Sequence, residues 1–441
     1  MNYSLIPFIV VLAISLIVGI IFSKTAKKSS NYFLGDRSLG WFLLMMTFVA
    51  TQVGGGFILG TAEAAYEHGF FGIFYSLGQA LGFLALGLGF GAKLQSLKLN
   101  TASELFETYY GSPGLKKFAA ALSITALTGI LIAQAVALHK FMYAVGVTNE
   151  WVFIASWLVV ILYTTQGGFL AVVWTDLLQA TLMIGILIAS FSYALSAPAA
   201  LPIEATFEYS EFSPHLLSLL VMPFLFMFIE QDMVQRCFAG KNQAAVTKGA
   251  LAASLVLFCL AIIPVYFGMV SKDAAVTSSA TSKFMEAISL STNSFVFSCA
   301  ACAVLLAIVS TASSLLSAIS SNIANDFYGL SKPRTITFVT GFVALSASYL
   351  SANIFGWMIA SYELAVGCLF IPLVSSVFLK ERCKNLLLAA KLSCILGCVG
   401  FIEAKIFDHG AIGLFVPLIM SGLGFVGGML LAKRSTVTAY E

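Results

Sequence analysis

Residues 45–57 read MMTFVATQVGGGF, an apolar stretch with three consecutive glycines, Gly54 to Gly56, before Phe57. Each glycine lowers the stability of a helix by about 1 kcal/mol relative to alanine. Inside a lipid bilayer, unwound backbone is tolerated only where it faces protein or a water-filled cavity. Small residues also let membrane helices pack closely, but in such packing motifs the glycines are usually spaced four residues apart. The contiguous run therefore favours an interrupted membrane helix.

The composition of the whole chain places this stretch in a membrane. Of the 441 residues, 59% are hydrophobic and 10% are charged, whereas soluble globular chains carry about 25% charged residues. The net charge of +3 is too small, and its carriers too dispersed, for nucleic-acid binding. The eight cysteines lie mostly in apolar runs and predict no disulfide framework. Because the apolar runs do not alternate, they predict an all-α polytopic protein rather than a β-barrel.

Windows of about 20 apolar residues mark the expected transmembrane helices. The sequence contains thirteen such windows, at 3–22, 39–66, 71–92, 118–146, 150–166, 177–196, 215–235, 249–270, 294–322, 335–353, 355–379, 386–402 and 411–432. The first has no basic segment before it and no A-x-A site after it, so we expect a retained helix rather than a signal peptide.

The distribution of Lys and Arg predicts the orientation of these helices. Basic residues gather in the connections after windows 1, 3, 7, 9, 11 and 13, whereas the opposite connections contain only Lys272, Lys283 and Lys405. We therefore expect a multi-pass protein of the plasma (inner) membrane, with its N-terminus outside and its C-terminus in the cytoplasm.

A second interruption is predicted in window 215–235, where Glu230-Gln231-Asp232 follows Pro223 by two turns. Carboxylates inside a membrane are costly and usually mark a binding site or an ion pathway. Alternatively, Glu230 and Asp232 lie at the cytoplasmic boundary and pair with Arg236.

The two interrupted windows are five windows apart and cross the membrane in opposite directions. This pattern is typical of inverted repeats in secondary transporters, which bind their substrate where the broken helices meet. We therefore expect one membrane domain, 1–441. Its expected parts are a first repeat at 39–196, a second at 197–380 and peripheral segments at 1–38 and 381–441.

Window 294–322 contains a cluster of hydroxyl side chains. Ser310, Ser313, Ser314 and Ser317 recur at helical spacing and share one face. Hydroxyl oxygens suit a small hard cation when backbone carbonyls complete the coordination. Serine also forms hydrogen bonds between membrane helices, so both interpretations stay open here.

Four motifs resemble the sodium:solute symporter family, whose members carry glucose, proline, sialic acid or choline. They are NYFLGDRSLGW at 31–41, GGFLAVVWTDLLQ at 167–179, DMVQR at 232–236 and Ser310-Thr311. The resemblance covers windows 1 to 11. It implies the leucine-transporter-like fold, a 5+5 inverted repeat with peripheral helices and about 13 transmembrane helices in all.

The resemblance also implies sodium as the coupling ion. Carried over by position, the principal sodium site takes the carbonyls of Ala50, Val53 and Ala307 and the hydroxyls of Ser310 and Thr311. A possible second sodium site falls on Asp176, Ser310, Ser313 and Ser314. Alternatively, Asp176 is a carboxylate that the dipole favours at a helix N-terminus.

The glycine stretch 53–64 is most similar to the choline-transporter branch of that family. The positions of that branch's cage tryptophans are occupied here by Gln52, Ala133 and Glu230, so the aromatic cage is missing. The residues expected to bind the solute are Gln52, Phe57, Gln79, Gln134 and Glu230. They predict a small polar solute, either amine-bearing or polyol-like, since carboxylates accept hydroxyl as well as ammonium hydrogens.

The expected function is sodium-coupled import of this solute by alternating access. Proton coupling through Glu230 or Asp176 is the alternative. The four histidines show no metal-ligand spacing, so we do not expect an enzyme. The expected partners are the solute, sodium and the lipid bilayer, with no nucleic acid and no obligate protein partner. Glu63 and Glu363 are left without an assigned role.

Overall fold

Helices make up nearly all the regular structure of the computed structural model. It describes residues 9–10, 12–18, 20–21, 32–196, 214–274, 282–328, 332–350, 353–379, 386–407, 413 and 415–437. Within these ranges, nine helices are long and apolar enough to cross a membrane. The fold class expected from the sequence is therefore confirmed. The first predicted window, 3–22, lies partly outside the described residues.

The first group of helical elements begins within the motif at 31–41. These elements are η1 (Gly35–Arg37), α2 (Trp41–Gln52), η2 (Gly56–Gly60), α3 (Thr61–His68), η3 (Gly69–Gly72), α4 (Ile73–Ala85), η4 (Leu86–Phe90), α5 (Gly91–Leu97), α6 (Glu104–Tyr110), α7 (Pro113–Ala144) and α8 (Glu150–Ser196). The second group consists of α9 (Pro214–Phe226), α10 (Gln231–Ala239), α11 (Gln243–Asp273), α12 (Lys283–Ser291), α13 (Ser294–Phe327), α14 (Pro333–Ala347) and α15 (Ile354–Phe378). Two further helices, α16 (Leu387–Ile406) and α17 (Val416–Val437), complete the chain.

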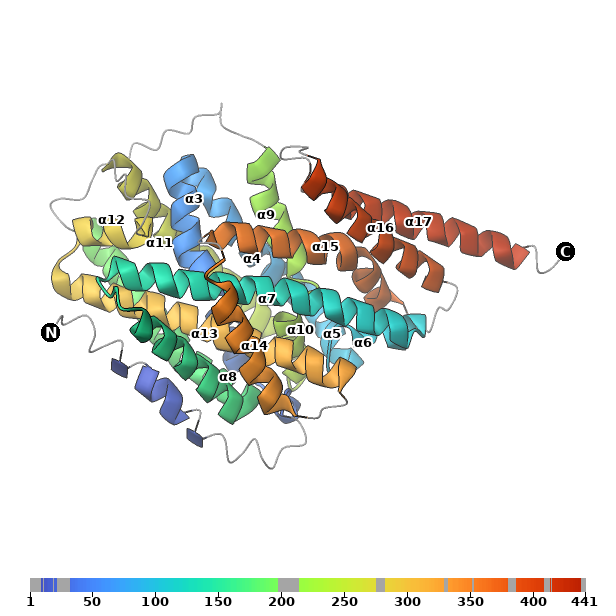
Figure 1. Cartoon of the computed structure of the whole chain (residues 1–441), viewed down its shortest axis with the longest axis horizontal. Coiled ribbons are helices and arrows are strands. Elements are labelled where there is room, and N and C mark those ends of the chain that lie inside the picture. Colours follow the sequence, from blue (N-terminus) through green and yellow to red (C-terminus); the bar gives the residue numbers. More distant parts are fainter. Residues whose placement is uncertain are drawn as a thin grey trace.

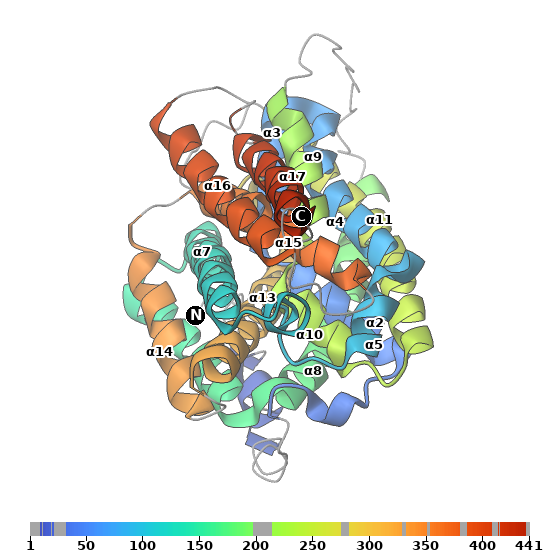
Figure 2. The same ribbon diagram turned by 90° about the vertical axis from the view of Figure 1, so that its right-hand side faces the viewer.

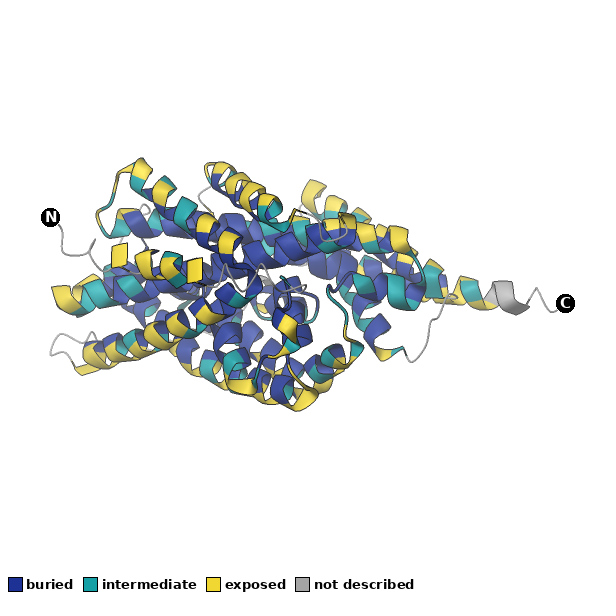
Figure 3. Ribbon diagram, turned by 90° about the horizontal axis from the view of Figure 1, so that it is seen from below, coloured by how far each residue is buried: buried dark blue, intermediate teal, exposed yellow. Residues whose placement is uncertain are grey.

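The core is built around α13, which packs against α7 and α8 and also contacts α2 and α10. Figure 1 shows α7, α13 and α15 running along the long axis of the molecule. Buried residues concentrate along these central helices, whereas the outer faces are exposed (Figure 3). The exposed residues include many large apolar side chains, such as Leu255 and Phe295, as expected for a surface in contact with lipid.

The peripheral helices α16 and α17 pack mainly against each other and against α15. They extend beyond the core at the C-terminal end of the molecule (Figure 1), and Figure 2 shows them from that end. The division into repeats at 39–196 and 197–380 stays a prediction.

A glycine divides α8 into two helical parts. Gly168 has φ 61° and ψ −165°, which an L side chain adopts only with strain. The next N–H group, that of Phe169, donates to the carbonyl of Tyr32 at 3.1 Å. The sequence predicted a connection over 167–176, but the helix resumes at Phe169. Asp176 therefore lies two turns inside a helix, and the prediction that a helix N-terminus accounts for it is wrong, because the dipole effect is confined to the first turn.

The motif at 31–41 holds α10 in place through backbone and side-chain hydrogen bonds. The Leu39 N–H donates to the carbonyl of Ala239 at 3.1 Å, and the Lys241 N–H donates to that of Leu39 at 3.0 Å. The amide of Gln235 donates to the carbonyl of Phe33 at 2.5 Å. Burial raises the pKa of Tyr32 to about 12, so its hydroxyl stays protonated and donates to the carbonyl of Thr165 at 3.0 Å. The bonds of Leu39, Lys241 and Gln235 set the position of α10, and the bond of Tyr32 ties the same motif to α8.

Candidate solute and sodium site

The first predicted interruption is present between α2 and η2. The last regular helical bond joins the Val53 N–H to the Val49 carbonyl, and Val53 itself has φ −79° and ψ 75°. The next N–H group, that of Gly54, donates to the carbonyl of Gln52 at 2.9 Å instead of reaching Ala50. The carbonyl of Ala50 therefore loses its usual partner within the helix and becomes available to other groups.

The contiguous glycines let three helices approach the break. A Cβ atom at Gly54 would lie 2.5 Å from the Thr311 Oγ1 of α13, and one at Gly55 would lie 2.4 Å from the Ala137 Cβ of α7. The Gly55 N–H also donates to the Gln134 Oε1 at 2.9 Å. A Cβ atom at Gly56 would lie 2.4 Å from the Met358 sulfur of α15. The nearest contact of each glycine is therefore with a different helix, which explains why the glycines are adjacent rather than spaced four apart.

The second predicted interruption is present between α9 and α10. After Phe226 the chain turns, and Glu230, at φ −64° and ψ 117°, precedes the first residue of α10. Its carboxylate is 4% exposed and that of Asp232 is fully buried. Among the described residues neither carboxylate forms an ion pair with Arg236, so the pairing in the alternative interpretation is absent, whereas the position of the two carboxylates relative to the membrane stays a prediction. Arg236 Nη1 donates to the backbone carbonyl of Asp232 at 3.0 Å, and Asp232 Oδ1 accepts the Met233 N–H.

Four residues of the predicted principal sodium site lie together. The Ser310 hydroxyl donates to the carbonyl of Ala50 at 2.7 Å and lies 3.0 Å from that of Ala307. Thr311 Oγ1 lies 3.3 Å from the carbonyl of Ala50. The fifth residue, Val53, is the buried residue that ends α2. Neutral carbonyl and hydroxyl oxygens of this kind are suited to a hard monovalent cation.

A small pocket lies where the two interruptions meet, and its free space of about 10 Å³ is close to what one water molecule needs. All five residues predicted to bind the solute line it, namely Gln52, Phe57, Gln79, Gln134 and Glu230. Gln52 Nε2 donates to Glu230 Oε2 at 2.9 Å, so the two interrupted segments are joined across the pocket. The lining residues, all in the described part of the chain, include no Lys, Arg or His.

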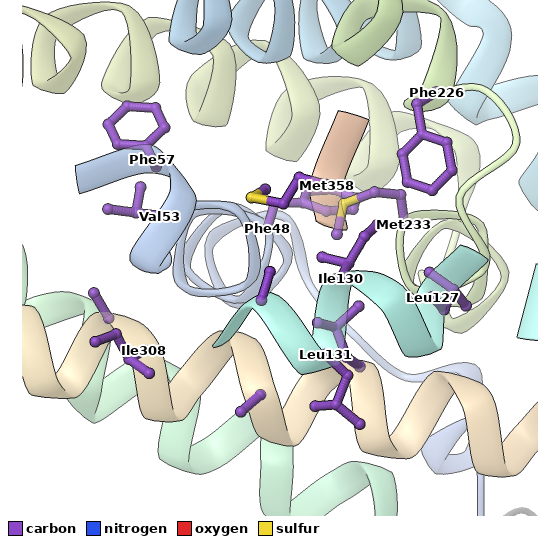
Figure 4. Close-up of a cluster of buried hydrophobic side chains, with 14 of the residues drawn as sticks. Phe48, Val53, Phe57, Leu127, Ile130, Leu131, Phe226, Met233, Ile308 and Met358 are labelled. Carbon is purple, nitrogen blue, oxygen red and sulfur yellow. The ribbon is translucent and has the colours of Figure 1, made fainter. Parts of the chain in front are cut away.

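Three side chains of the pocket were missed by the sequence analysis. The hydroxyls of Tyr75 and Tyr362 lie 3.0 Å apart, and Gln79 Nε2 donates to that of Tyr75 at 3.1 Å. Met358 also lines the pocket, with its sulfur 3.8 Å from the Tyr75 hydroxyl. Figure 4 shows the apolar surroundings, including Phe57 and Phe226. No local motif distinguishes these aromatic residues from the others in an aromatic-rich chain.

Two of the four residues of the possible second sodium site, Asp176 and Ser314, bind a guanidinium. Arg236 Nη2 lies 3.1 Å from Asp176 Oδ2 and 2.6 Å from the Ser314 hydroxyl. The hydroxyl of Ser313 donates to the carbonyl of Ser310 at 2.9 Å. The pair of Arg236 with Asp176 joins two helices through residues 60 positions apart in the chain, and no local pattern in the sequence predicts it.

The two unassigned glutamates form ion pairs outside the pocket. Glu63 Oε1 lies 3.3 Å from Lys140 Nζ, and Glu363 Oε2 lies 2.6 Å from Lys405 Nζ of α16. Glu363 is 3% exposed, so its pair with Lys405 connects the core helix α15 to a peripheral helix.

Comparison with known proteins identifies the family. The sequence profile of the sodium:solute symporter family matches residues 32–337. A sodium/proline symporter of Haemophilus influenzae is 29% identical over 75% of this chain and 72% of its own length. The human high affinity choline transporter 1 is 31% identical, over 47% of this chain and 38% of its own length.

A similar fold is found in a solved structure of a Na⁺-coupled sialic acid symporter in a substrate-bound, outward-open state. The TM-score is 0.80 at 19% identity, over 98% of this chain and 97% of that one. This likeness shows the leucine-transporter-like fold. Together with the family profile, which spans more than half of the sequence, it leads to one conclusion: the chain belongs to the sodium:solute symporter family.

Proposed function

We propose that this protein imports a small organic cation together with sodium, and that the carboxylate of Glu230 binds the ammonium group of that solute. The observation that carries the proposal is the pocket between the two interruptions. It combines two deeply buried carboxylates, those of Glu230 and Asp232, with aromatic faces, amide groups and no basic side chain. A cation in such a place gains a charged hydrogen bond and the attraction of the aromatic rings.

Sodium binds, in this proposal, to the carbonyls of Ala50, Val53 and Ala307 and to the hydroxyls of Ser310 and Thr311. Support comes from the convergence of four of these residues at the end of α2. Sodium and solute share that interruption, so each favours the same arrangement of α2 and α13. Ligands can shift alternating access only through their differential affinity for the two states.

A polyol is the second candidate solute. Gln79 Oε1 is buried and accepts no hydrogen bond from the described residues, and the tyrosine hydroxyls offer further partners. Carboxylates accept hydroxyl hydrogens as well as ammonium hydrogens, so a polyol also fits these groups.

Thermal stability of the detergent-purified protein tests sodium binding first. A ligand that binds the folded state raises the midpoint of thermal unfolding by mass action. We expect NaCl to raise the midpoint above that in equimolar KCl, and small amines to raise it further only in NaCl. A midpoint that responds to pH but not to sodium would favour proton coupling through Glu230 or Asp176.

Uptake into proteoliposomes then identifies the solute class. We expect a sodium gradient to drive accumulation of a labelled amine, and Glu230→Gln to abolish it. The matched control is Glu67→Gln, because Glu67 has an exposed side chain outside the pocket. Accumulation of polyols but not amines would replace the cation by the second candidate. The proposed orientation, with the N-terminus outside in the plasma membrane, is tested by labelling cysteines introduced at each terminus.

A further inference from the structure

One guanidinium joins four helices next to the pocket. Arg236 of α10 donates from Nε to Thr47 Oγ1 of α2 at 2.9 Å and from Nη2 to Ser314 of α13 at 2.6 Å. It also pairs with Asp176 of α8 at 3.1 Å. The side chain of Arg236 is 1% exposed. A cation buried this deeply needs acceptors for its donors, and Nε, Nη1 and Nη2 of Arg236 each donate to at least one.

The same acceptors are the ones expected to hold a second sodium ion. Asp176 and Ser314 belong to the predicted second site, and both are hydrogen-bonded to Arg236 Nη2. A sodium ion at these oxygens would meet a positive charge within bonding distance in a buried environment, where repulsion is strong. In the arrangement described here, the second-site residues therefore do not fit sodium while the guanidinium is in place.

The carboxylate of Asp176 nevertheless keeps an unused acceptor. Its Oδ1 is buried and has no hydrogen-bond partner among the described residues, whereas Oδ2 accepts from Thr47 and Arg236. Buried carboxylate oxygens are rarely left without a partner. The unpartnered Oδ1 therefore indicates that Asp176 can bind a cation other than Arg236.

Arg236 is connected to the solute pocket by a short stretch of chain. Glu230, which lines the pocket, immediately precedes α10, and Arg236 lies one and a half turns into that helix. Its Nη1 also bonds to the carbonyl of Asp232, which lines the same pocket. Movement of α10 when the pocket opens or closes would therefore move the guanidinium away from or toward Asp176.

We propose that Arg236 is a built-in competitor of sodium at Asp176: the guanidinium occupies this site in one conformation, and sodium takes it when α10 moves away. The inference builds on the sodium coupling proposed above and concerns a different set of oxygens. It explains why Oδ1 of Asp176 has no partner among the described residues. It also explains why this carboxylate belongs both to the ion pair with Arg236 and to the predicted second sodium site. It also makes the number of bound sodium ions depend on conformation.

Sodium titrations of thermal stability, with KCl keeping the total salt constant, test this competition. In Arg236→Gln the competitor is removed, so the sodium concentration for half-maximal stabilisation should fall by about tenfold, within the usual range for coupled ligands. In Asp176→Asn/Arg236→Gln both charges are gone, so the titration should return to that of the wild type. Lys248→Gln, an exposed change on α11, serves as the control.

The single variant leaves the charge of Asp176 unpaired, and it can fail to fold without sodium. Folding in NaCl but not in KCl would itself support the proposal. If Arg236→Gln folds in neither salt, the sodium titration is repeated with Arg236→Lys. A lysine ammonium lacks the planar, branched guanidinium that reaches Thr47, Asp176 and Ser314 together. The half-maximal sodium concentration of Arg236→Lys should fall by about threefold.

Unchanged or weaker sodium binding in Arg236→Gln, or in Arg236→Lys where the first variant does not fold, would overturn the competition. Such a result leaves the principal site intact, because the wild type would still respond to sodium through Ser310 and Thr311. Absence of any sodium response in the wild type would instead refute the proposed function, so the two failures can be told apart.

Discussion

The two interrupted helices both expose backbone groups inside the protein, but different side chains surround the two interruptions. At the first, Gly54 and its neighbours free the Ala50 carbonyl, and only neutral oxygens from Ser310 and Thr311 meet it. At the second, Pro223 lies one turn before the break, and the turn ends in the carboxylate of Glu230. Helix interruption exposes backbone in both cases, but the neighbouring side chains decide whether a bare metal cation or an organic cation is favoured.

The comparison predicts that sodium binding depends most on the neutral oxygens of the first interruption. Ser310→Ala with Thr311→Ala should raise the sodium concentration for half-maximal uptake by about 10- to 100-fold, the range seen when groups that support a bound metal are lost. Sodium-dependent uptake in proteoliposomes measures it. Ser320→Ala is the control, because its hydroxyl bonds only within α13, to Leu316. Unchanged sodium dependence in a well-folded double variant would remove sodium from this site.

The carboxylate of the second interruption should affect solute binding and leave sodium binding in place. In Glu230→Gln the amide still accepts from Gln52 but no longer attracts an ammonium group, so amine affinity should fall by at least about tenfold. Amine titrations of thermal stability in NaCl measure the loss, and a sodium titration without amine should match the wild type. If Glu230→Gln lost sodium binding and kept amine binding, the second interruption would bind sodium and the first would bind the solute.

The backbone of the first interruption should tolerate no added side chain. In Gly54→Ala the new Cβ would lie 2.5 Å from Thr311 Oγ1. This clash would push the Thr311 hydroxyl away from the proposed sodium site. We expect a loss of about 1–3 kcal/mol in stability, as for other overpacked sites, together with weaker sodium binding. Thermal unfolding in NaCl and in KCl separates the two effects. Gly40→Ala has open space around it and should change neither. Full sodium affinity in Gly54→Ala would show that this close approach does not matter.

The sequence predicted both interruptions because their causes are local. Three adjacent glycines, and a proline followed by buried carboxylates, are visible without any knowledge of the fold. The sequence also predicted that Gln52 and Glu230 serve one site, and they meet at 2.9 Å. That prediction depended on the family resemblance, which relates positions that are far apart in the chain.

What the sequence could not predict depends on long-range packing. Tyr75 and Tyr362 come from helices 287 residues apart and meet through their hydroxyl groups. The alternative interpretation of the sequence paired Arg236 with carboxylates on its own segment, four and six residues away. It pairs instead with Asp176, since α8 brings that residue next to α10. Local spacing cannot distinguish these partners, because several buried carboxylates lie within reach of one long side chain.

The smallest expected effect concerns the hydroxyl pair beside the second interruption. Tyr362→Phe keeps the ring but removes one partner of Tyr75, which still receives the hydrogen bond of Gln79. A single neutral hydrogen bond contributes about 1 kcal/mol, so amine affinity should change by less than about fivefold, whereas a polyol that needs the hydroxyl should lose more. Parallel amine and polyol titrations in NaCl measure this difference. An equal loss for both solutes would mean that the ring position, rather than the hydroxyl, matters, and that the carboxylate of Glu230 is not alone in selecting the solute.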